Sequence, residues 1–501
     1  MEFLAVQIAC ALLLAMYLAV LCSHKVYWFL AVGIYGASAV LTGGYLLADA
    51  FTGDGVTEAV LFHLIYGLDG VKLSEFLVYV LAVILFGLAL LSSFVFFWRA
   101  LQHRKGLTSK YKIAELVTLG SLSIFAVILH PTTLQSAQLA SDMLAKADIP
   151  LDEELANFNL QRAEGSEKKS LVYIYVESLE GIFLKEDVFP GLAPNLAALE
   201  QESLHIRGIR QAPLTDWTIA GMVASQCGIP LATFKIDRND FSDVDGFLPG
   251  ATCLGEILKQ SGYYSVFMGG ADLNFAGKGR FYKEHGFDEV IGRHELEATS
   301  KQALPLSKWG VYDDYLLESA YERFKALADA EEPFALFLLT LDTHPPIGHK
   351  TPSCENHIYA DGESGILNAV HCSDKLISSF IRRIEQYAGD DLIVVVASDH
   401  LQMRNDIHDF LVARDAQREN LFFVRGGGIG PELIQRSATT LDIFPTLLNL
   451  MGWETDSAAL GRNLLEPGET LMEKYGKDQF YSSLQKWRTQ AWKAWSPHST
   501  D

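Results

Sequence analysis

Five polar residues in the second half of the chain have types that could perform chemistry together. They are Glu177, Thr215, His344 and the pair Asp399-His400, and each follows a short apolar run. Carboxylates and imidazoles bind divalent ions such as Mn²⁺, Zn²⁺ or Mg²⁺. A threonine hydroxyl that binds such an ion loses its proton more easily and becomes a nucleophile. This set of residues therefore indicates metal-assisted transfer of a phosphoryl-type group through a covalent enzyme intermediate.

Each of these residues also has a structural interpretation. A carboxylate at a strand end often caps a helix or pairs with a cation. Thr215 could cap a helix that begins near Thr218, and a lone His344 is more often a hydrogen-bonded surface or core residue than a ligand. An Asp-His pair occurs by chance about once in a chain of this length. The common position of the residues after apolar runs favours a shared site over these separate interpretations.

The elements that must position these residues have an α/β pattern from residue 171 onward. Short β-branched runs that alternate with amphipathic stretches predict a mostly parallel sheet covered by helices. In such sheets the site lies at the carboxyl ends of the strands. The predicted strands are 171–176, 205–209, 264–268, 334–341, 392–397 and 421–424, and the predicted helices include 193–201, 255–261, 313–328 and 373–387.

The first third of the chain is dominated by apolar sequence. Four segments approach or exceed the ~20 residues that span a bilayer, namely 3–22, 26–47, 76–98 and 113–129. The first lacks the basic start of a signal peptide and is followed by further spans. Basic residues gather in 99–112, whereas 48–75 is mostly acidic. The positive-inside rule then places 99–112 in the cytoplasm and the chain after about residue 132 outside.

Charge divides the chain in the same way. Residues 1–132 are neutral, so the net charge of -21 belongs to the remainder. An acidic domain argues against nucleic acid as a partner and fits solubility beside a membrane. The basic, aromatic stretch 486–495 could lie at the membrane interface or pack on the domain. We expect an α-helical transmembrane region of about four helices (1–132), a stem (133–170), an extracytoplasmic α/β domain (171–465) and a C-terminal tail (466–501).

Cysteine usage agrees with export of the α/β domain. Cys10 and Cys22 lie in the first apolar segment, and the other four cysteines lie beyond residue 170. An even number in an exported domain suggests two disulfides, with buried free thiols as the alternative. Three pairings are possible, and the nearest-neighbour pairing closes the shortest loops. That pairing, which we expect, is Cys227–Cys253 and Cys354–Cys372.

Several long motifs resemble, in the same order, those of the phosphoglycerol transferase I family. Enzymes of this family decorate osmoregulated periplasmic glucans in Gram-negative bacteria. The resemblance covers about residues 40–425 and is strongest in LVYIYVESLE (171–180) and TDWTIAGMVASQCGIP (215–230), with further matches at 51–61, 274–278, 340–344 and 397–401. More distantly, the domain looks like lipoteichoic acid synthase, in the alkaline phosphatase/sulfatase superfamily. The four exported cysteines also match positions in this family.

The resemblance implies a metal site and a nucleophile. It implies one divalent ion, Mn²⁺ or Mg²⁺, with Thr215 as the nucleophile and with ligands Glu177, Thr215, Asp399 and His400. Four further residues are implied to contact the substrate: Asp272, Asn274, Lys278 and His344. Lys278 stands where the distant relative has a phosphate-binding arginine, and a lysine keeps the charge but not the bidentate geometry.

The resemblance also implies an activity and a location. The expected enzyme attacks phosphatidylglycerol, releases diacylglycerol, and passes phosphoglycerol from Thr215 to a periplasmic glucan. It would be a multi-pass protein of the bacterial inner membrane with its catalytic domain in the periplasm. A phosphoethanolamine transferase that modifies lipid A and a non-catalytic lipid or glucan sensor are the alternatives. Sulfatase activity is not expected, because the sequence around Thr215 lacks a Cys/Ser-x-Pro-x-Arg motif.

Overall fold

The computed structural model describes most of the chain after residue 126. The described residues are 25–53, 55–61, 127–156, 160–232 and 246–495, with isolated positions within 81–99 and at 121 and 125. The chain divides into two compact units. The first comprises residues 1–61 and 71–142, and the second comprises residues 62–70 and 143–501.

The first unit contains helix α2 (Lys25–Thr52) and most of α6 (Pro131–Leu144). Within it, the Thr132 hydroxyl donates to the Leu41 carbonyl at 2.9 Å, which joins the start of α6 to α2. The apolar segment 26–47 lies inside α2, and the other three predicted spans lie wholly or largely outside the described residues. Among the described helices, none combines the length and the apolar character needed to cross a bilayer. The four-span membrane region therefore stays a prediction.

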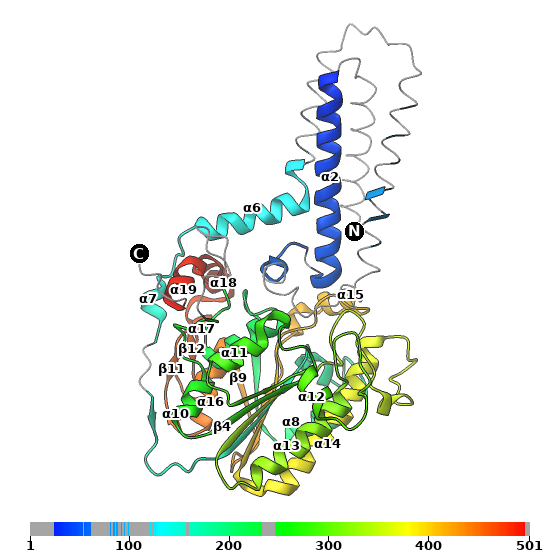
Figure 1. The fold of residues 1–501 in the computed structure, drawn as a ribbon. Coiled ribbons are helices and arrows are strands. Elements are labelled where there is room, and N and C mark those ends of the chain that lie inside the picture. Colours follow the sequence, from blue (N-terminus) through cyan, green and yellow to red (C-terminus); the bar gives the residue numbers. More distant parts are fainter. Residues whose placement is uncertain are drawn as a thin grey trace. The chain divides into compact units, whose positions relative to one another are not determined.

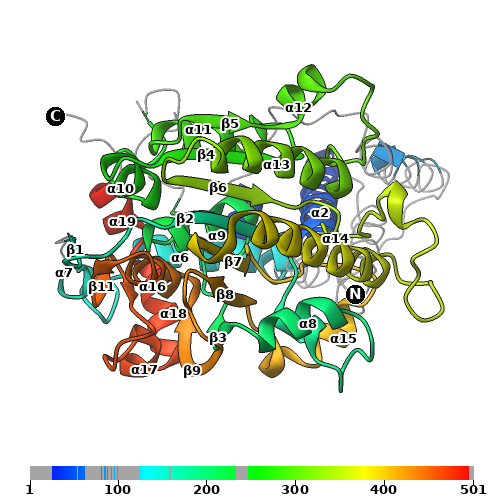
Figure 2. The same ribbon diagram turned by 90° about the horizontal axis from the view of Figure 1, so that it is seen from below.

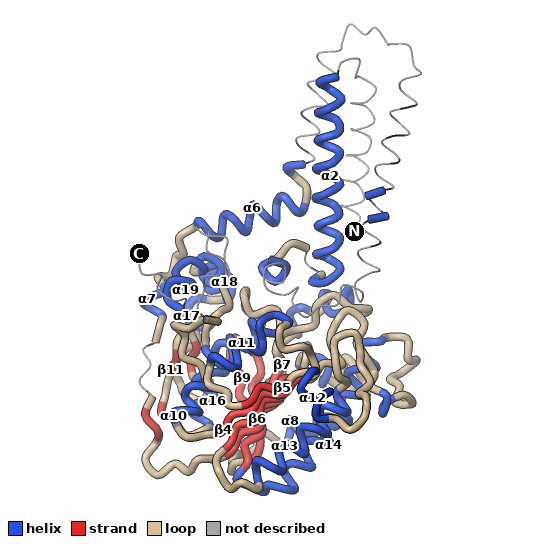
Figure 3. The backbone as a smooth tube through the Cα atoms, in the orientation of Figure 1, coloured by secondary structure: helices blue, strands red, loops and turns tan. Residues whose placement is uncertain are grey.

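The second unit is built on an eight-stranded sheet (Figures 1 and 3). Its strand order, β5-β4-β6-β2-β7-β8-β3-β9, can be followed in Figure 2. Strand β8 is antiparallel to its neighbours β7 and β3, and the remaining pairs are parallel. The prediction of a mostly parallel sheet is confirmed. The strands are β2 (Ser170–Val176), β3 (Leu204–Arg210), β4 (Tyr264–Gly269), β5 (Glu289–Ile291), β6 (Phe334–Leu339), β7 (Leu392–Ser398), β8 (Phe422–Gly426) and β9 (Glu432–Thr439).

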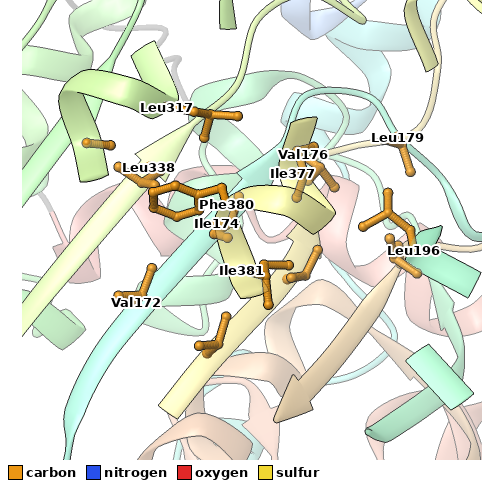
Figure 4. Close-up of a cluster of buried hydrophobic side chains, with 14 of the residues drawn as sticks. Val172, Ile174, Val176, Leu179, Leu196, Leu317, Leu338, Ile377, Phe380 and Ile381 are labelled. Atoms are coloured by element: carbon orange, nitrogen blue, oxygen red, sulfur yellow. The ribbon is translucent and has the colours of Figure 1, made fainter. Parts of the chain in front are cut away.

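Helices cover both faces of this sheet because its central strands are apolar on both sides. On β2, Val172, Ile174 and Val176 pack into a buried cluster with α8 (Pro194–Gln201), α13 (Asp313–Ala328) and α14 (Gly365–Ala388) (Figure 4). The alternate residue Tyr175 faces the other side, where its hydroxyl lies 2.8 Å from the Ser225 hydroxyl of α9. The helices on that side include α9 (Thr218–Cys227), α10 (Leu254–Gln260), α11 (Lys278–Glu284) and α16 (Ile443–Leu450) (Figures 1 and 2).

Differences from the predicted elements have local causes. All six predicted strands are present within one or two residues, but β6 ends at Leu339 because the chain turns there toward His344. The predicted helix 373–387 is the second part of α14, which begins at Gly365. Strands β5 and β9 were not predicted, since β5 has only three residues and β9 is a largely exposed edge strand.

Segments on both sides of the predicted α/β domain pack against it. Strand β1 (Gln161–Arg162), in the predicted stem, pairs with β10 (Trp453–Glu454). In the predicted tail, the Tyr481 hydroxyl donates to the Gln211 carbonyl of the domain at 2.8 Å, and the buried Trp487 indole donates to the Ile149 carbonyl of the stem at 2.7 Å. The remaining elements are α7 (Leu151–Glu154), α12 (Arg293–Thr299), α15 (His408–Val412), β11 (Ser457–Ala458), β12 (Gly461–Arg462), α17 (Leu471–Tyr475), α18 (Lys477–Lys486) and α19 (Arg488–Trp495).

Two disulfides fix loops around the sheet. One joins the end of α9 to the start of α10, with a Cα–Cα distance of 4.2 Å. The other joins a loop after β6 to α14, with a Cα–Cα distance of 5.9 Å. The pairs are Cys227–Cys253 and Cys354–Cys372, so the nearest-neighbour pairing is confirmed.

Helix α9 approaches the carboxyl end of β7 more closely than a side chain would allow. A Cβ atom on Gly221 would lie 1.8 Å from the carbonyl oxygen of Asp399. Real Cβ atoms do not come so near a backbone oxygen, so only glycine permits this packing. The absence of a side chain at Gly221 therefore sets the distance between α9 and the residues that follow β7.

We predict that Gly221→Ala destabilises the domain by about 1–3 kcal/mol, because the added methyl group meets backbone that cannot rotate away. Thermal unfolding of the purified protein measures this effect. Gly430→Ala is the matched control, since a Cβ there has nothing within 4 Å. An unchanged unfolding midpoint for Gly221→Ala would show that the helix and the strand do not lie this close.

Candidate active site

Two neighbouring strands bring the central residues of the site together. Strands β2 and β7 are parallel and adjacent, and Val176 pairs with Ser398 at their ends. The residues that come next, Glu177 and Asp399-His400, therefore leave the sheet side by side. Each offers one ligand atom, and these atoms lie within 4.8 Å of one another at buried positions. We call these three residues the acid–imidazole cluster.

The imidazole of His400 is oriented by the backbone. Its Nδ1 lies 2.7 Å from the Leu401 carbonyl and donates to it, which leaves Nε2 facing the cluster. That Nε2 is 3.4 Å from Glu177 Oε1 and 3.4 Å from Asp399 Oδ2. A single ring nitrogen is therefore shared by two carboxylates.

The two carboxylates are held by the turn after β2. Ser178 has a left-handed backbone, with φ of 51°, and its amide donates to Asp399 Oδ1 at 2.8 Å. The Ser178 hydroxyl donates to Glu177 Oε1 at 2.8 Å. Apart from its 3.4 Å ion-pair contact with His400 Nε2, the buried Asp399 Oδ2 accepts no hydrogen bond from any residue that the structure describes. A buried oxygen of this kind needs a partner, because an unsatisfied buried polar atom is costly.

The electrostatics of the cluster favour added positive charge. Burial, reinforced by the neighbouring Glu177, raises the pKa of the Asp399 carboxyl. Burial alone would lower the pKa of His400, but Asp399 and Glu177 together raise it to about 10. Two carboxylates and an imidazole are also a usual donor set for Mn²⁺, Mg²⁺ or Zn²⁺. The orphaned Asp399 oxygen and this donor set fit a divalent ion.

Two threonines near the cluster differ in what their hydroxyls contact. The Thr215 hydroxyl is buried and donates to the Ala212 carbonyl at 2.8 Å. The Thr218 hydroxyl lies 3.4 Å from Glu177 Oε2, to which it donates, and 3.5 Å from His400 Nε2. Thr218 is the first residue of α9, with Trp217 as its N-cap. Of these two threonines, the one whose hydroxyl contacts the cluster is therefore Thr218, three positions after Thr215.

The third strand end supplies His344. Its Nδ1 lies 2.7 Å from the Pro345 carbonyl, and its ring packs on Trp309 with 3.9 Å between ring centroids. Burial lowers the pKa of His344, while the charge of Glu177 opposes that shift. With Nδ1 donating to the backbone, Nε2 of this neutral imidazole is the atom available to a substrate.

The start of α11, the helix that follows β4, supplies a cation. Lys278 is buried, its Nζ lies 4.6 Å from the centroid of the Phe275 ring, and burial lowers its pKa to about 8 against the opposing charges of Glu177 and Asp399. The other two predicted substrate residues lie in the segment between β4 and α11, and the charge of Asp272 also opposes the lowering of the Lys278 pKa. Asp272 accepts from the Asn274 amide at 2.8 Å and pairs with His294 at 3.0 Å, and Asn274 is exposed.

Sequence reasoning did not assign roles to three residues of this site. The residues in question are Thr218, which stands at a predicted helix start, Ser178, which follows Glu177, and Trp309. The helical pattern that begins at Thr218 was a usable signal, since the first residue of a helix at a strand end points toward the site. No local pattern distinguishes Ser178 or Trp309, because their contacts come from distant segments.

Comparison with known proteins gives two family matches. Residues 169–453 match the family model described as Sulfatase. Residues 3–149 match the model described as phosphoglycerol transferase I, N-terminal domain. The first match covers more than half of the chain and contains the whole acid–imidazole cluster.

Individual relatives agree with these matches. The chain is 37% identical over 462 residues to phosphoglycerol transferase I of Xanthomonas euvesicatoria pv. vesicatoria (strain 85-10), and covers 64% of that protein's length with 91% of its own. A solved protein in the alkaline phosphatase superfamily from Vibrio parahaemolyticus is 25% identical, with a TM-score of 0.52 over 67% of this chain and 79% of that one.

A lipoteichoic acid synthase from Listeria monocytogenes is 16% identical, with a TM-score of 0.51 over 66% of this chain and 92% of that one, and shows the fold alone. The eight-stranded sheet and the acid–imidazole cluster both lie within the longer of the two family matches. On that match, the chain belongs to the sulfatase family.

Proposed function

We propose that this chain is a phosphoglycerol transferase that moves phosphoglycerol from phosphatidylglycerol to a periplasmic glucan. The observation that carries the proposal is a hydroxyl, that of Thr218, next to a buried acid–imidazole cluster at the end of a parallel sheet. The similarity to phosphoglycerol transferase I over 91% of the chain supports the choice of transferred group. The start of α9 differs from the Cys/Ser-x-Pro-x-Arg pattern, which argues against sulfate ester hydrolysis within the sulfatase family.

In the first half of the reaction, the Thr218 oxygen attacks the phosphorus of phosphatidylglycerol. Glu177 Oε2, 3.4 Å away, is placed to receive the hydroxyl proton. The bond from phosphorus to the diacylglycerol oxygen breaks, that oxygen takes up the proton from Glu177, and phosphoglycerol remains on Thr218. The N-terminus of α9 favours the negative charge that gathers there.

In the second half, a glucan hydroxyl attacks the same phosphorus and the bond from phosphorus to the Thr218 oxygen breaks. That oxygen takes up the proton that the glucan hydroxyl releases, which restores the Thr218 hydroxyl. The neutral His344 has an available Nε2 that can take the proton of the incoming hydroxyl. Lys278 supplies positive charge to the phosphate. A divalent ion held by Glu177, Asp399 and His400 would neutralise phosphoryl oxygens and promote loss of the hydroxyl proton.

The nucleophile is a choice between two threonines. The resemblance to the family points to Thr215 as both ligand and nucleophile. The contacts favour Thr218, because the Thr215 hydroxyl is engaged by Ala212 whereas the Thr218 hydroxyl contacts two cluster residues. We therefore place the nucleophile at Thr218 and keep Thr215 as the alternative that the experiment must exclude.

We propose further that the enzyme is a multi-pass protein of the bacterial inner membrane with the site in the periplasm. Residues 3–149 match the N-terminal domain of phosphoglycerol transferase I, and they contain the four apolar segments. A lipid donor gives a membrane region a clear purpose, because tethering holds the site near the headgroup. Two disulfides in the α/β domain fit an oxidising compartment.

We predict that Thr218→Ala lowers release of diacylglycerol from phosphatidylglycerol by at least about 10³-fold, because the attacking oxygen is gone. Thr218→Ser keeps that oxygen and retains part of the activity. Thr215→Ala loses one hydrogen bond, worth about 1 kcal/mol of stability, and stays within a few-fold of wild type. The assay uses purified protein with Mn²⁺ and labelled lipid, with and without glucan.

Peptide mass spectrometry after incubation without acceptor locates the covalent adduct. We expect one added phosphoglycerol mass on Thr218. An adduct on Thr215, together with an active Thr218→Ala enzyme, would restore Thr215 as the nucleophile. Turnover of phosphatidylethanolamine in place of phosphatidylglycerol would instead identify a phosphoethanolamine transferase.

His344→Ala is expected to raise the donor KM about tenfold and leave Mn²⁺ binding unchanged, because His344 faces the substrate and is not in the cluster. Calorimetric titration with Mn²⁺ and steady-state kinetics measure the two effects. His205→Ala is the control, since the Nδ1 of His205 also contacts a nearby carbonyl, at 3.1 Å, but at the opposite end of the sheet. Loss of Mn²⁺ binding in His344→Ala would make His344 a ligand instead.

To test the location, a reporter enzyme that is active only in the periplasm is fused after residue 170, and we expect this fusion to be active. The reason is the excess of basic residues in 99–112, which places that loop in the cytoplasm. A second fusion within 99–112 should be active only with a cytoplasmic reporter. The reverse pattern for the two fusions would refute the proposed orientation.

A further inference from the structure

The side chain of Gln402 connects the segment that follows β7 with the segment that follows β6. Its side-chain Nε2 donates to the Thr343 carbonyl at 2.8 Å, directly before His344. Gln402 itself lies two residues after His400. One buried side chain thus connects the backbone that carries the imidazole of the cluster with the backbone that carries the proposed substrate histidine.

Gln402 is held in turn by a buried ion pair. Glu180 is fully buried, and its two carboxylate oxygens accept from Arg418 Nε and Nη2, each at 2.8 Å. The same Glu180 accepts from the Gln402 amide at 3.2 Å, and the same Arg418 donates to the Gln402 carbonyl at 2.7 Å. Both backbone polar groups of Gln402 are therefore fixed by one carboxylate–guanidinium pair.

Glu180 also links the segment that follows β2 to this network. Glu180 lies three residues after Glu177, in the turn that follows β2. The circle closes on the other side, where the Thr343 hydroxyl donates to the Glu177 carbonyl. The segments after β2, β6 and β7 are thus joined in one ring of hydrogen bonds. The side chains of the acid–imidazole cluster take no part in that ring.

We propose that Gln402, held by the Glu180–Arg418 pair, is a positioning residue that keeps the metal-binding cluster and His344 at a fixed separation. The inference rests on the proposed function, because it assumes that the cluster binds a metal ion and that His344 meets the substrate. The segments after β2, β6 and β7 are far apart in sequence, so no short covalent connection holds them at a fixed separation. Groups that orient metal ligands in this way typically change metal affinity or activity 10–100-fold when they are removed.

The test uses Gln402→Met, which keeps a long side chain and removes the hydrogen bond to Thr343. We expect the Kd for Mn²⁺, measured by calorimetry, to rise about tenfold, and the donor KM to rise as well. Glu180→Gln, a second variant, keeps the shape of the side chain and weakens the grip on Arg418. It is expected to shift both quantities in the same direction.

Gln226→Met is the matched control. Gln226 is also a buried glutamine, and its Nε2 donates to the Tyr282 hydroxyl at 3.0 Å at the far end of α9. It should lower the unfolding midpoint and leave the Kd for Mn²⁺ and the donor KM as in wild type. A general loss of stability would affect all three variants alike, whereas a positioning role affects only the first two.

Wild-type Mn²⁺ affinity and donor KM in both Gln402→Met and Glu180→Gln would overturn the proposal. An equal loss of Mn²⁺ affinity in Gln226→Met would overturn it too, because the effect would then be general destabilisation. Failure of the proposed function gives a different result. In that case wild-type protein binds Mn²⁺ and loses affinity on Gln402→Met, but it releases no diacylglycerol from phosphatidylglycerol.

Discussion

Two carboxylates are buried against one imidazole, and the rest of the site depends on how their charge is compensated. Glu177 and Asp399 are almost fully shielded from water, and both lie 3.4 Å from His400 Nε2. Burying such charge is costly unless a cation or proton balances it. The pKa of His400 is raised because a proton on its imidazole balances the charge of the two carboxylates. A divalent ion would meet the same demand with twice the charge of a proton.

A parallel sheet is well suited to hold such a cluster. Adjacent parallel strands end at the same edge, so residues from β2 and β7 meet although more than two hundred positions separate them. The strands themselves are apolar on both faces and rigidly covered by helices. The polar groups Glu177, Asp399 and His400 therefore lie directly after the ends of β2 and β7, at the edge of the apolar sheet. The cost of burying the cluster is offset by the packing of the sheet beneath it.

Helix α9 carries the Thr218 hydroxyl, and close backbone packing fixes the position of this helix. Gly221 allows the helix backbone to touch the Asp399 carbonyl, and the Cys227–Cys253 disulfide anchors the other end of the helix. Between these fixed points, Thr218 is directed at Glu177 and His400. The ring of hydrogen bonds around Gln402 fixes the remaining loops in the same manner. The site is thus defined by backbone contacts at least as much as by its own side chains.

The sequence by itself determined the α/β class, the central strands, the acid–imidazole residues and the disulfide pairing. These follow from apolar runs, from what comes directly after them, and from short loops, all of which are local patterns. Only the tertiary structure distinguishes the contacts of Thr215 from those of Thr218, because three positions at a helix start change which hydroxyl faces the cluster. Only the tertiary structure revealed Gln402 as well, since its partners come from three distant segments. Local sequence records which residues form a strand or helix, but the distances between segments are set by packing.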